Sequence, residues 1–197
     1  MRRAPWLAAA IRSTIAIAVV SAASVAVSDE AMFPHWKGLS DFRAAWYSEH
    51  LRAMGEHALS DSAAGEHVRF LLLPSIQHPV SVRIDCDESC RLVAYQLSGF
   101  GGYEPGEISK RVDRRLSLDE ARVFNDQLDA ANLWSGQPEN DAGLDGSQWI
   151  VEAQRPEGYV AWDVWSPVGP PFEAFIDLCR LMQRLAALDT KSAEHPQ

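Results

Sequence analysis

A chain of 197 residues, 47% of them apolar, is long enough to bury one ordinary hydrophobic core. Its 12 glycines, 11 prolines and 3 cysteines exclude collagen-like chains, low-complexity chains and small disulfide-dense scaffolds. The 27 acidic residues outnumber the 18 basic residues and give a formal net charge of −9. This charge argues against nucleic acid as the main partner, because phosphate binding relies on many lysines and arginines.

The first 28 residues have the composition of a secretory signal peptide. They contain Arg2, Arg3 and Arg12 but no acidic residue, and a 14-residue apolar stretch runs from Thr14 to Val27. A membrane span needs about 20 apolar residues, so we expect cleavage between residues 23 and 28 and no stable membrane span afterwards. The mature chain is then periplasmic or secreted, and its 15 basic and 27 acidic residues give a net charge of −12. A mitochondrial transit peptide is the alternative, although the apolar block is too continuous for an amphipathic helix.

After a short leader that contains Pro34 and Trp36, the mature chain is predicted to form a helix. Ser40 is placed to cap this helix, which runs to about Leu59. Its apolar residues recur every three or four positions, as expected for one buried face: Ala44, Tyr47, Leu51, Met54 and Ala58. The polar, glycine-containing stretch 60–65 then links the helix to a run of strands.

Four strands are predicted next, at 68–73, 79–86, 91–98 and 108–116. The second strand shows clean alternation of apolar and polar side chains, which is typical of an antiparallel strand with one buried face. The glycine-rich segment 99–106 precedes a strand and not a helix. It therefore lacks the helix N-terminus on which a phosphate-binding loop depends, and it is predicted to be a plain strand connection.

The cysteines fit an exported protein. Cys86 and Cys90 enclose three polar residues between two predicted strands, so they face each other at the mouth of a hairpin. Facing residues of antiparallel strands lie near the separation that a disulfide requires, and we expect a structural bond here. A redox-active pair is the alternative, but its usual spacing and its following helix are missing. Cys179 lies in an apolar helical pattern and is predicted to be a buried apolar residue.

Two more helices are predicted in the C-terminal half. Ser117 and Glu120 have the spacing of a capping box, in which each side chain accepts a hydrogen bond from the other's backbone N–H. The last helix opens at Pro170, and its apolar residues cover most of its circumference. Between these helices, residues 148–154 and 159–165 are predicted to form a hairpin.

The predicted elements place the chain in the α+β class. Residues 29–190 are predicted to form a single domain in the order helix, four strands, helix, two strands, helix, and residues 191–197 a disordered tail. We expect one antiparallel sheet of about six strands with the helices packed on one face.

Part of the C-terminal region resembles small, uncharacterised exported bacterial proteins. The resemblance rests on residues 116–134, 143–149 and 165–167, and it covers about the last 80 residues. It implies a bacterial secretory setting and the same α+β unit. It implies no activity, because none is established for these proteins.

A basic cluster interrupts the acidic chain in the fourth predicted strand. It comprises Lys110, Arg111, Arg114 and Arg115. Alternation places Lys110 and Arg114 on the same side as apolar residues, which is unusual for a central strand. One interpretation is an edge strand whose charges prevent sheets from joining edge to edge. The other is a contact for an anionic ligand or an acidic partner.

The last predicted hairpin is rich in aromatic residues. If Arg155 pairs with Tyr159, then Trp149, Trp165 and Asp163 share one face of the hairpin. Core packing explains the tryptophans, since aromatic cross-strand pairs stabilise sheets. The alternative is a cleft in which Asp163 orients a polar ligand, such as a glycan, stacked on the indole rings. A one-residue change in the turn would reverse these faces.

The sequence contains no recognisable motif for catalysis or for a cofactor. His50 and His57 lie seven residues apart on the first predicted helix, which is too far to share one zinc ion. The nucleophile elbow, the nucleotide loop and the usual metal spacings are missing from the sequence as well. We therefore expect no metal and no cofactor, and we favour a non-catalytic protein.

These observations favour an exported, soluble binding protein of the bacterial envelope, of the inhibitor, immunity or accessory type. Its partner is expected to be a protein of the envelope. The alternative is a small envelope hydrolase, or an enzyme that binds a glycan or peptide, with Asp163 in an aromatic cleft as general acid or base. The candidate binding residues are Lys110, Arg111, Arg114, Arg115, Trp149, Asp163 and Trp165.

Overall fold

A computed structural model describes residues 31–188 except 34–35, 60–64, 141–142 and 144. By their contacts, all of these residues belong to one unit, which holds the sheet and its helices. The predicted signal peptide at 1–28 and the predicted tail at 191–197 lie outside the described residues. The elements, in chain order, are α1 (Asp41–Ala53), β1 (Glu66–Pro74), β2 (Val80–Cys86), β3 (Cys90–Leu97), β4 (Ile108–Arg115), α2 (Leu118–Ala131), the 3-10 helix η2 (Leu133–Ser135), β5 (Ser147–Arg155), β6 (Gly158–Trp165), the 3-10 helix η3 (Pro170–Phe172) and α3 (Glu173–Ala186).

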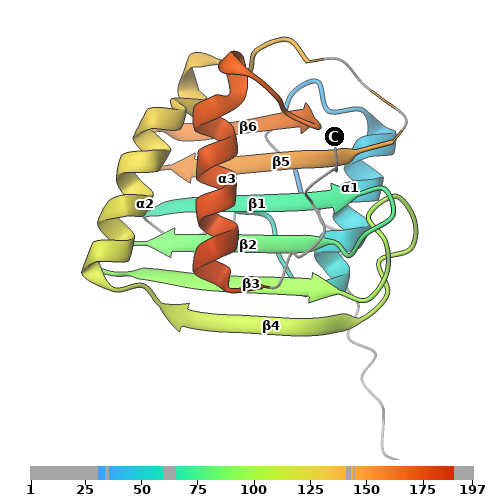
Figure 1. Cartoon of the computed structure of the whole chain (residues 1–197), viewed down its shortest axis with the longest axis horizontal. Helices are drawn as coiled ribbons and strands as arrows, with labels where there is room; N and C mark the ends of the chain where they lie inside the picture. Colours follow the sequence, from blue (N-terminus) through green and yellow to red (C-terminus); the bar gives the residue numbers. More distant parts are fainter. Residues whose placement is uncertain (1–30, 34–35, 60–64, 141–142, 144, 189–197) are drawn as a thin grey trace, which may run out of the picture. The chain divides into compact units, whose positions relative to one another are not determined.

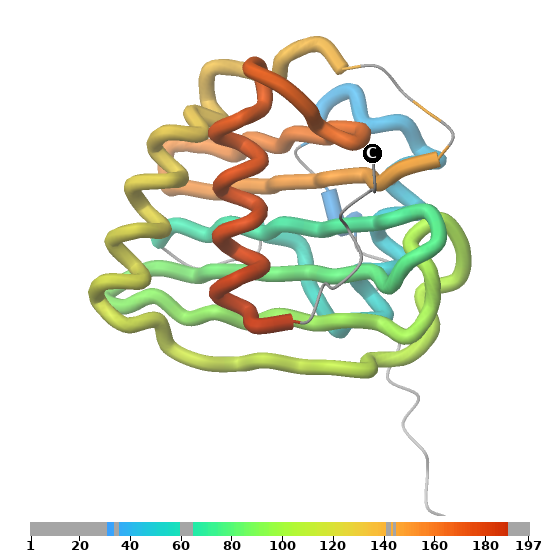
Figure 2. Tube along the Cα trace, in the orientation of Figure 1, coloured from blue at the N-terminus to red at the C-terminus, as the bar shows by residue number. Residues whose placement is uncertain are grey.

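The six strands form one antiparallel sheet in the order β4-β3-β2-β1-β5-β6, with β4 and β6 at its edges (Figures 1 and 2). The order of the elements and the α+β class are as the sequence predicts. The first strand of the chain lies inside the sheet, because the β5–β6 hairpin pairs along β1 on the side opposite to β2.

Helices cover both faces of the sheet, which differs from the expectation that all of them share one face. Helices α2 and α3 cross one face together, and α1 lies behind the other (Figure 1). Phe124 of α2 and Phe175 of α3 belong to the core on the first face, whereas Tyr47, Leu51 and Met54 of α1 belong to a separate core on the second. The physical reason lies in β1, whose side chains are buried from His67 to Pro74 and therefore need cover on both faces.

Local signals explain where the helices begin and end. The predicted capping box is confirmed: the Ser117 hydroxyl accepts from Glu120 N at 3.2 Å, and the Glu120 carboxylate accepts from Ser117 N at 2.8 Å. Helix α1 begins after the Ser40 cap as expected, but it ends at Ala53 and not near Leu59. Gly55 follows with a φ of 73°, a left-handed conformation that ends helices and favours glycine.

The expected disulfide is present. Cys86 and Cys90 pair across the start of the β2–β3 hairpin with a Cα–Cα distance of 4.1 Å, and their sulfur atoms are bonded. Cys179 is buried in α3, and burial raises the pKa of its thiol, so it is held as the neutral thiol at physiological pH. Among the described residues, no helix combines the length and the apolar character that a membrane crossing requires.

Candidate functional site

The loops at one end of the sheet meet α1 and form a groove. It has a volume of about 690 Å³. Its walls come from the first half of α1, the turn after β1, the β3–β4 loop, the start of β5 and the end of β6. These segments gather at the right in Figure 1. Its aromatic lining consists of Phe42, Trp46, Tyr103 and Trp165, and its charged lining of Arg43, Glu49 and Asp145. This size lies within the range of pockets that bind ligands.

The spacing of residues on α1 divides the helix into two stripes. Phe42, Trp46 and Glu49 follow one another at four and three positions and face the groove. Tyr47 and Leu51 lie on the neighbouring stripe and are fully buried against the sheet. The amphipathic pattern of the sequence identifies the buried stripe alone. The groove-facing stripe lies outside that pattern. Its two large aromatic residues, Phe42 and Trp46, are the sequence signal that could have identified it.

Asp163 of β6 lies beneath the groove and is surrounded by donors. Its Oδ2 accepts from Arg43 Nη1 at 2.7 Å and from the Tyr47 hydroxyl at 2.9 Å. Its Oδ1 accepts from the amide nitrogen of Gln148, which lines the groove floor. The Asp163 side chain is 7% exposed, so these three partners, and not water, satisfy the carboxylate.

Burial and the negative charge of Asp163 raise the pKa of Tyr47 well above its ordinary value. Tyr47 therefore stays a neutral hydroxyl that donates to the carboxylate. A carboxylate held by an arginine, a tyrosine and an amide is a fixed structural acceptor. Its side chain is 7% exposed, whereas a general base in an aromatic cleft must reach its substrate.

The predicted pairing of the β5–β6 hairpin is wrong by one residue. Arg155 pairs with Gly158 and not with Tyr159, because the turn contains only two residues. Asp163 therefore lies opposite Ile150 on the α1 side, and Trp165 opposite Gln148 on the same side. Trp149 does not share this face, because it alternates to the other side of β5.

Trp149 packs on the face that α2 and α3 cover. Its ring lies 5.4 Å from that of Phe70, and its indole N–H donates to the Ser147 hydroxyl at 2.8 Å. Of the three candidate residues of this hairpin, Asp163 and Trp165 thus remain together at the groove. Trp149 is excluded from the groove and stabilises the core.

The β3–β4 loop is anchored to both α1 and the β1–β2 turn. The Trp46 indole N–H donates to the carbonyl of Gly101 at 2.8 Å, and Gly101 N donates to the carbonyl of Gln77 at 3.0 Å. A Cβ at Gly101 would lie 2.5 Å from the Pro74 carbonyl oxygen, so only glycine fits this close approach. The segment 99–106 is a strand connection, as predicted, and it carries Tyr103 into the groove wall.

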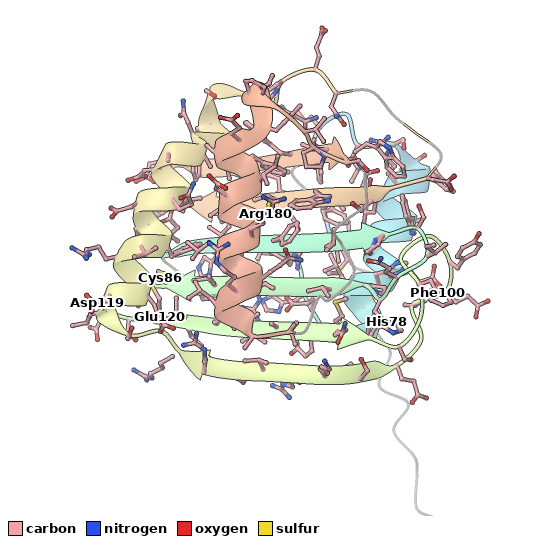
Figure 3. The ribbon with its side chains drawn as sticks, in the orientation of Figure 1. His78, Cys86, Phe100, Asp119, Glu120 and Arg180 are labelled. Atoms are coloured by element: carbon pink, nitrogen blue, oxygen red, sulfur yellow. A yellow bond between two sulfur atoms is a disulfide. The ribbon has the colours of Figure 1, made fainter. Side chains whose placement is uncertain are left out.

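Exposed apolar side chains concentrate around this end of the molecule. Phe42 is 76% exposed, Ile76 74% and Tyr103 68%, and all three line the groove. Phe100 is also exposed and stacks on His78 with ring centroids 6.0 Å apart; Figure 3 shows both at the loop end, away from Cys86 and Glu120. Clusters of exposed apolar side chains mark interaction sites more often than scattered ones do.

The basic cluster lies on β4, which is an edge strand, as the first of the two interpretations expects. Its charges are divided between the two faces, and several have partners within the chain. Arg114 makes two hydrogen bonds to the Glu120 carboxylate, at 2.9 and 3.0 Å, and caps the Leu185 carbonyl at 2.8 Å. Arg111 lies 5.7 Å from the centre of the Tyr95 ring.

Asp113 reduces the positive charge of this strand further. Arg91 of β3 binds its carboxylate through two nitrogens, at 2.8 and 2.7 Å, and these hydrogen bonds lower the pKa of Asp113. The β4 strand is thus an exposed edge with a mixed ion-pair network. Arg115, which donates to the Ser89 hydroxyl at 3.2 Å, completes the cluster near the disulfide.

A buried charge cluster that the sequence did not reveal lies on the α1 side of the sheet. Arg69 is fully buried and binds Glu152 on the neighbouring strand through two nitrogens, at 2.8 and 2.5 Å. Its third nitrogen donates to the His57 carbonyl at 2.6 Å. The carboxylate of Glu56 lies 3.6 Å from Arg69 and 2.9 Å from Arg83. These contacts tie the segment after α1 to three strands, and they are too enclosed to serve as a ligand site.

The histidines that the structure describes serve the packing of the fold, as His50 shows. His50 is buried, with Nδ1 3.0 Å from the Trp46 carbonyl and Nε2 3.4 Å from the Phe100 carbonyl, so it bridges α1 and the β3–β4 loop. Across the part of the chain that the structure describes, no group of three His, Cys, Asp or Glu side chains is placed to hold a metal ion. Comparison of the chain with protein-family models and with curated proteins finds no match, so its residues and their geometry carry the functional argument.

Proposed function

We propose that the chain is an exported, non-catalytic binding protein of the cell envelope, which holds a segment of a partner protein in the groove beside α1. The observation that supports this proposal most directly is the cluster of exposed apolar side chains in the groove walls, of which Phe42, Ile76 and Tyr103 are the most exposed. These residues belong to neither hydrophobic core, and a cluster of exposed apolar side chains marks an interaction site more often than scattered ones do.

Two further observations support this proposal over the enzymatic alternative. The carboxylate of Asp163, which the alternative assigns as general acid or base, is held by Arg43, Tyr47 and Gln148 beneath the groove. The disulfide Cys86–Cys90 and the signal-like N-terminal segment support export, because structural disulfides belong to oxidising compartments. The resemblance to exported bacterial proteins agrees with the same setting.

The test is crosslinking and co-purification of the tagged, oxidised chain from an envelope extract of its own source cells, at low and high salt. The groove variant carries Phe42→Ser and Tyr103→Ser. The matched control is Leu118→Ser, because Leu118 is 90% exposed on α2, on the opposite face. We expect a stoichiometric partner with the wild type and the control, and loss of that partner with the groove variant.

The basic edge strand supplies the competing surface and is tested in parallel. The variant Arg111→Glu with Arg115→Glu reverses two exposed charges of β4. Loss of the partner with this variant, together with retention by the groove variant, would move the binding site to β4. Retention by both variants would overturn the proposal that either surface binds the partner. Export itself is tested by N-terminal sequencing of the envelope fraction, which should begin between residues 24 and 29.

A further inference from the structure

The charges around the groove indicate which chemistry it accepts. Of the described residues that line it, three are charged, and Arg43 is the only cation among them. Arg43 lies 2.7 Å from Asp163, so its positive charge is compensated within the protein. Glu49 and Asp145 are exposed, and neither takes part in an ion pair with another described residue. The lining therefore presents two uncompensated negative charges.

Aromatic faces accompany these carboxylates. Phe42 and Trp46 stand next to each other on α1 with ring centroids 6.3 Å apart, and Tyr103 and Trp165 face them from the loops and from β6. Aromatic rings attract cations through the negative charge of their faces, and they pack against apolar chains at the same time. Carboxylates and aromatic rings together form the usual environment of a bound ammonium or guanidinium group.

We propose that the groove binds a basic segment of the partner protein, in which a lysine or arginine enters between the aromatic rings and its neighbours are apolar. This inference rests on the proposed function and names the chemistry of the partner. The cation is placed to pair with Glu49, and the flanking apolar side chains cover Ile76 and Phe42. The net charge of −12 expected for the mature chain favours the approach of a basic partner from a distance.

A peptide occupant fits the groove better than a small free cation. The volume of about 690 Å³ exceeds what one ammonium group needs, and the exposed rim formed by Phe42, Ile76 and Tyr103 is apolar. A small cation would leave that rim uncovered. A short segment with apolar residues on both sides of the basic one would cover it and would gain from its burial.

The proposal is tested by titrating the full-length, oxidised chain with a synthetic peptide, acetyl-Gly-Ser-Leu-Lys-Leu-Ser-Gly-amide, followed by tryptophan fluorescence and calorimetry. The first comparison peptide replaces lysine by norleucine, which keeps the alkyl chain without the charge. The second probe is hexylammonium, a free cation. We expect saturable binding of the lysine peptide that weakens as salt rises, and binding of norleucine peptide and hexylammonium that is weaker by about tenfold.

Two variants locate the contact. Glu49→Gln should weaken binding of the lysine peptide by about threefold, and Phe42→Leu, which keeps an apolar side chain, by about threefold as well. The matched control is Glu157→Gln, because Glu157 is exposed in the β5–β6 turn at the other end of the sheet and should leave affinity unchanged.

Each other outcome overturns the inference in a distinguishable way. If the norleucine peptide bound as tightly as the lysine peptide, the groove would bind an apolar segment and not a cation. If hexylammonium bound as tightly as the lysine peptide, the ligand would be a free cation and not a peptide segment. Failure of the lysine peptide to bind would also reject the inference. The proposed function is rejected by a different result, in which the groove variant still retains its partner in the co-purification.

Discussion

Replacement of Asp163 tests whether this carboxylate is a structural acceptor under the groove. In Asp163→Leu, the donors lose every acceptor oxygen, and two of them are buried: Tyr47 is 0% exposed and Gln148 is 2% exposed. An unpaired buried donor costs about 1–3 kcal/mol, so this variant should lose about 2–6 kcal/mol of unfolding free energy. Arg43 is 39% exposed and can turn to water, so it adds little.

The isosteric variant Asp163→Asn should be milder. Its amide oxygen can replace Oδ2 as acceptor for Arg43 and Tyr47, and a rotated Gln148 amide can accept from its nitrogen. Only the charge is lost, which should cost about 1–2 kcal/mol. The assay is urea unfolding at neutral pH, followed by fluorescence and circular dichroism, with equal slopes as the condition for comparison. Unchanged stability in both variants would refute the reasoning, and so would equal losses.

Other contacts allow three further predictions. The Arg114 guanidinium and the Ser117 backbone lower the pKa of Glu120 from 4.5 to about 2, so the stability they provide is complete above pH 4.5 and is lost as the pH falls towards 2; the difference in Tm between wild type and Glu120→Gln should shrink over that window, and a constant difference would contradict this. Arg69→Met leaves the buried Glu152 carboxylate without its cationic partner and should cost about 3–5 kcal/mol in urea unfolding, whereas the double variant with Glu152→Leu should recover part of the loss. Gly101→Ala should displace the β3–β4 loop and shift the tryptophan emission, because Trp46 is hydrogen-bonded to Gly101; an unchanged emission spectrum would contradict this.

Alternation and capping signals made most of the fold predictable. The alternation of Val80, Val82 and Ile84 fixes a strand and its buried face, and the pair Ser117 and Glu120 fixes the start of α2. The stripe on α1 identifies a buried helix face, but it carries no information on which face of the sheet receives it. The apolar run of β1 was the available signal, because a central strand buried on both sides requires cover on both sides.

The site was less predictable because it depends on register and on distant contacts. From the sequence, Gly158 is compatible with the last position of the turn or with the first position of the next strand. This one-residue difference in register decides whether Trp149 or Gln148 lies on the same face as Asp163. Asp163 and Arg43 are separated by 120 positions along the chain, so no local pattern joins them. The groove lining has the same origin, since it is assembled from five segments of the chain that the sheet order brings together.

The two edges of the sheet are protected from pairing with another strand by different means. On β6, the Gln137 side-chain amide exchanges two hydrogen bonds with the backbone of Asp163, at 2.6 and 2.9 Å, and Asn140 does the same with Trp165, at 2.5 and 3.1 Å. Two side-chain amides thus act as a surrogate strand, and an incoming strand finds these positions occupied. On β4, charged side chains protect the edge. If those charges were neutralised, two copies could join β4 to β4, and growth would stop at a closed dimer because the remaining edge is capped.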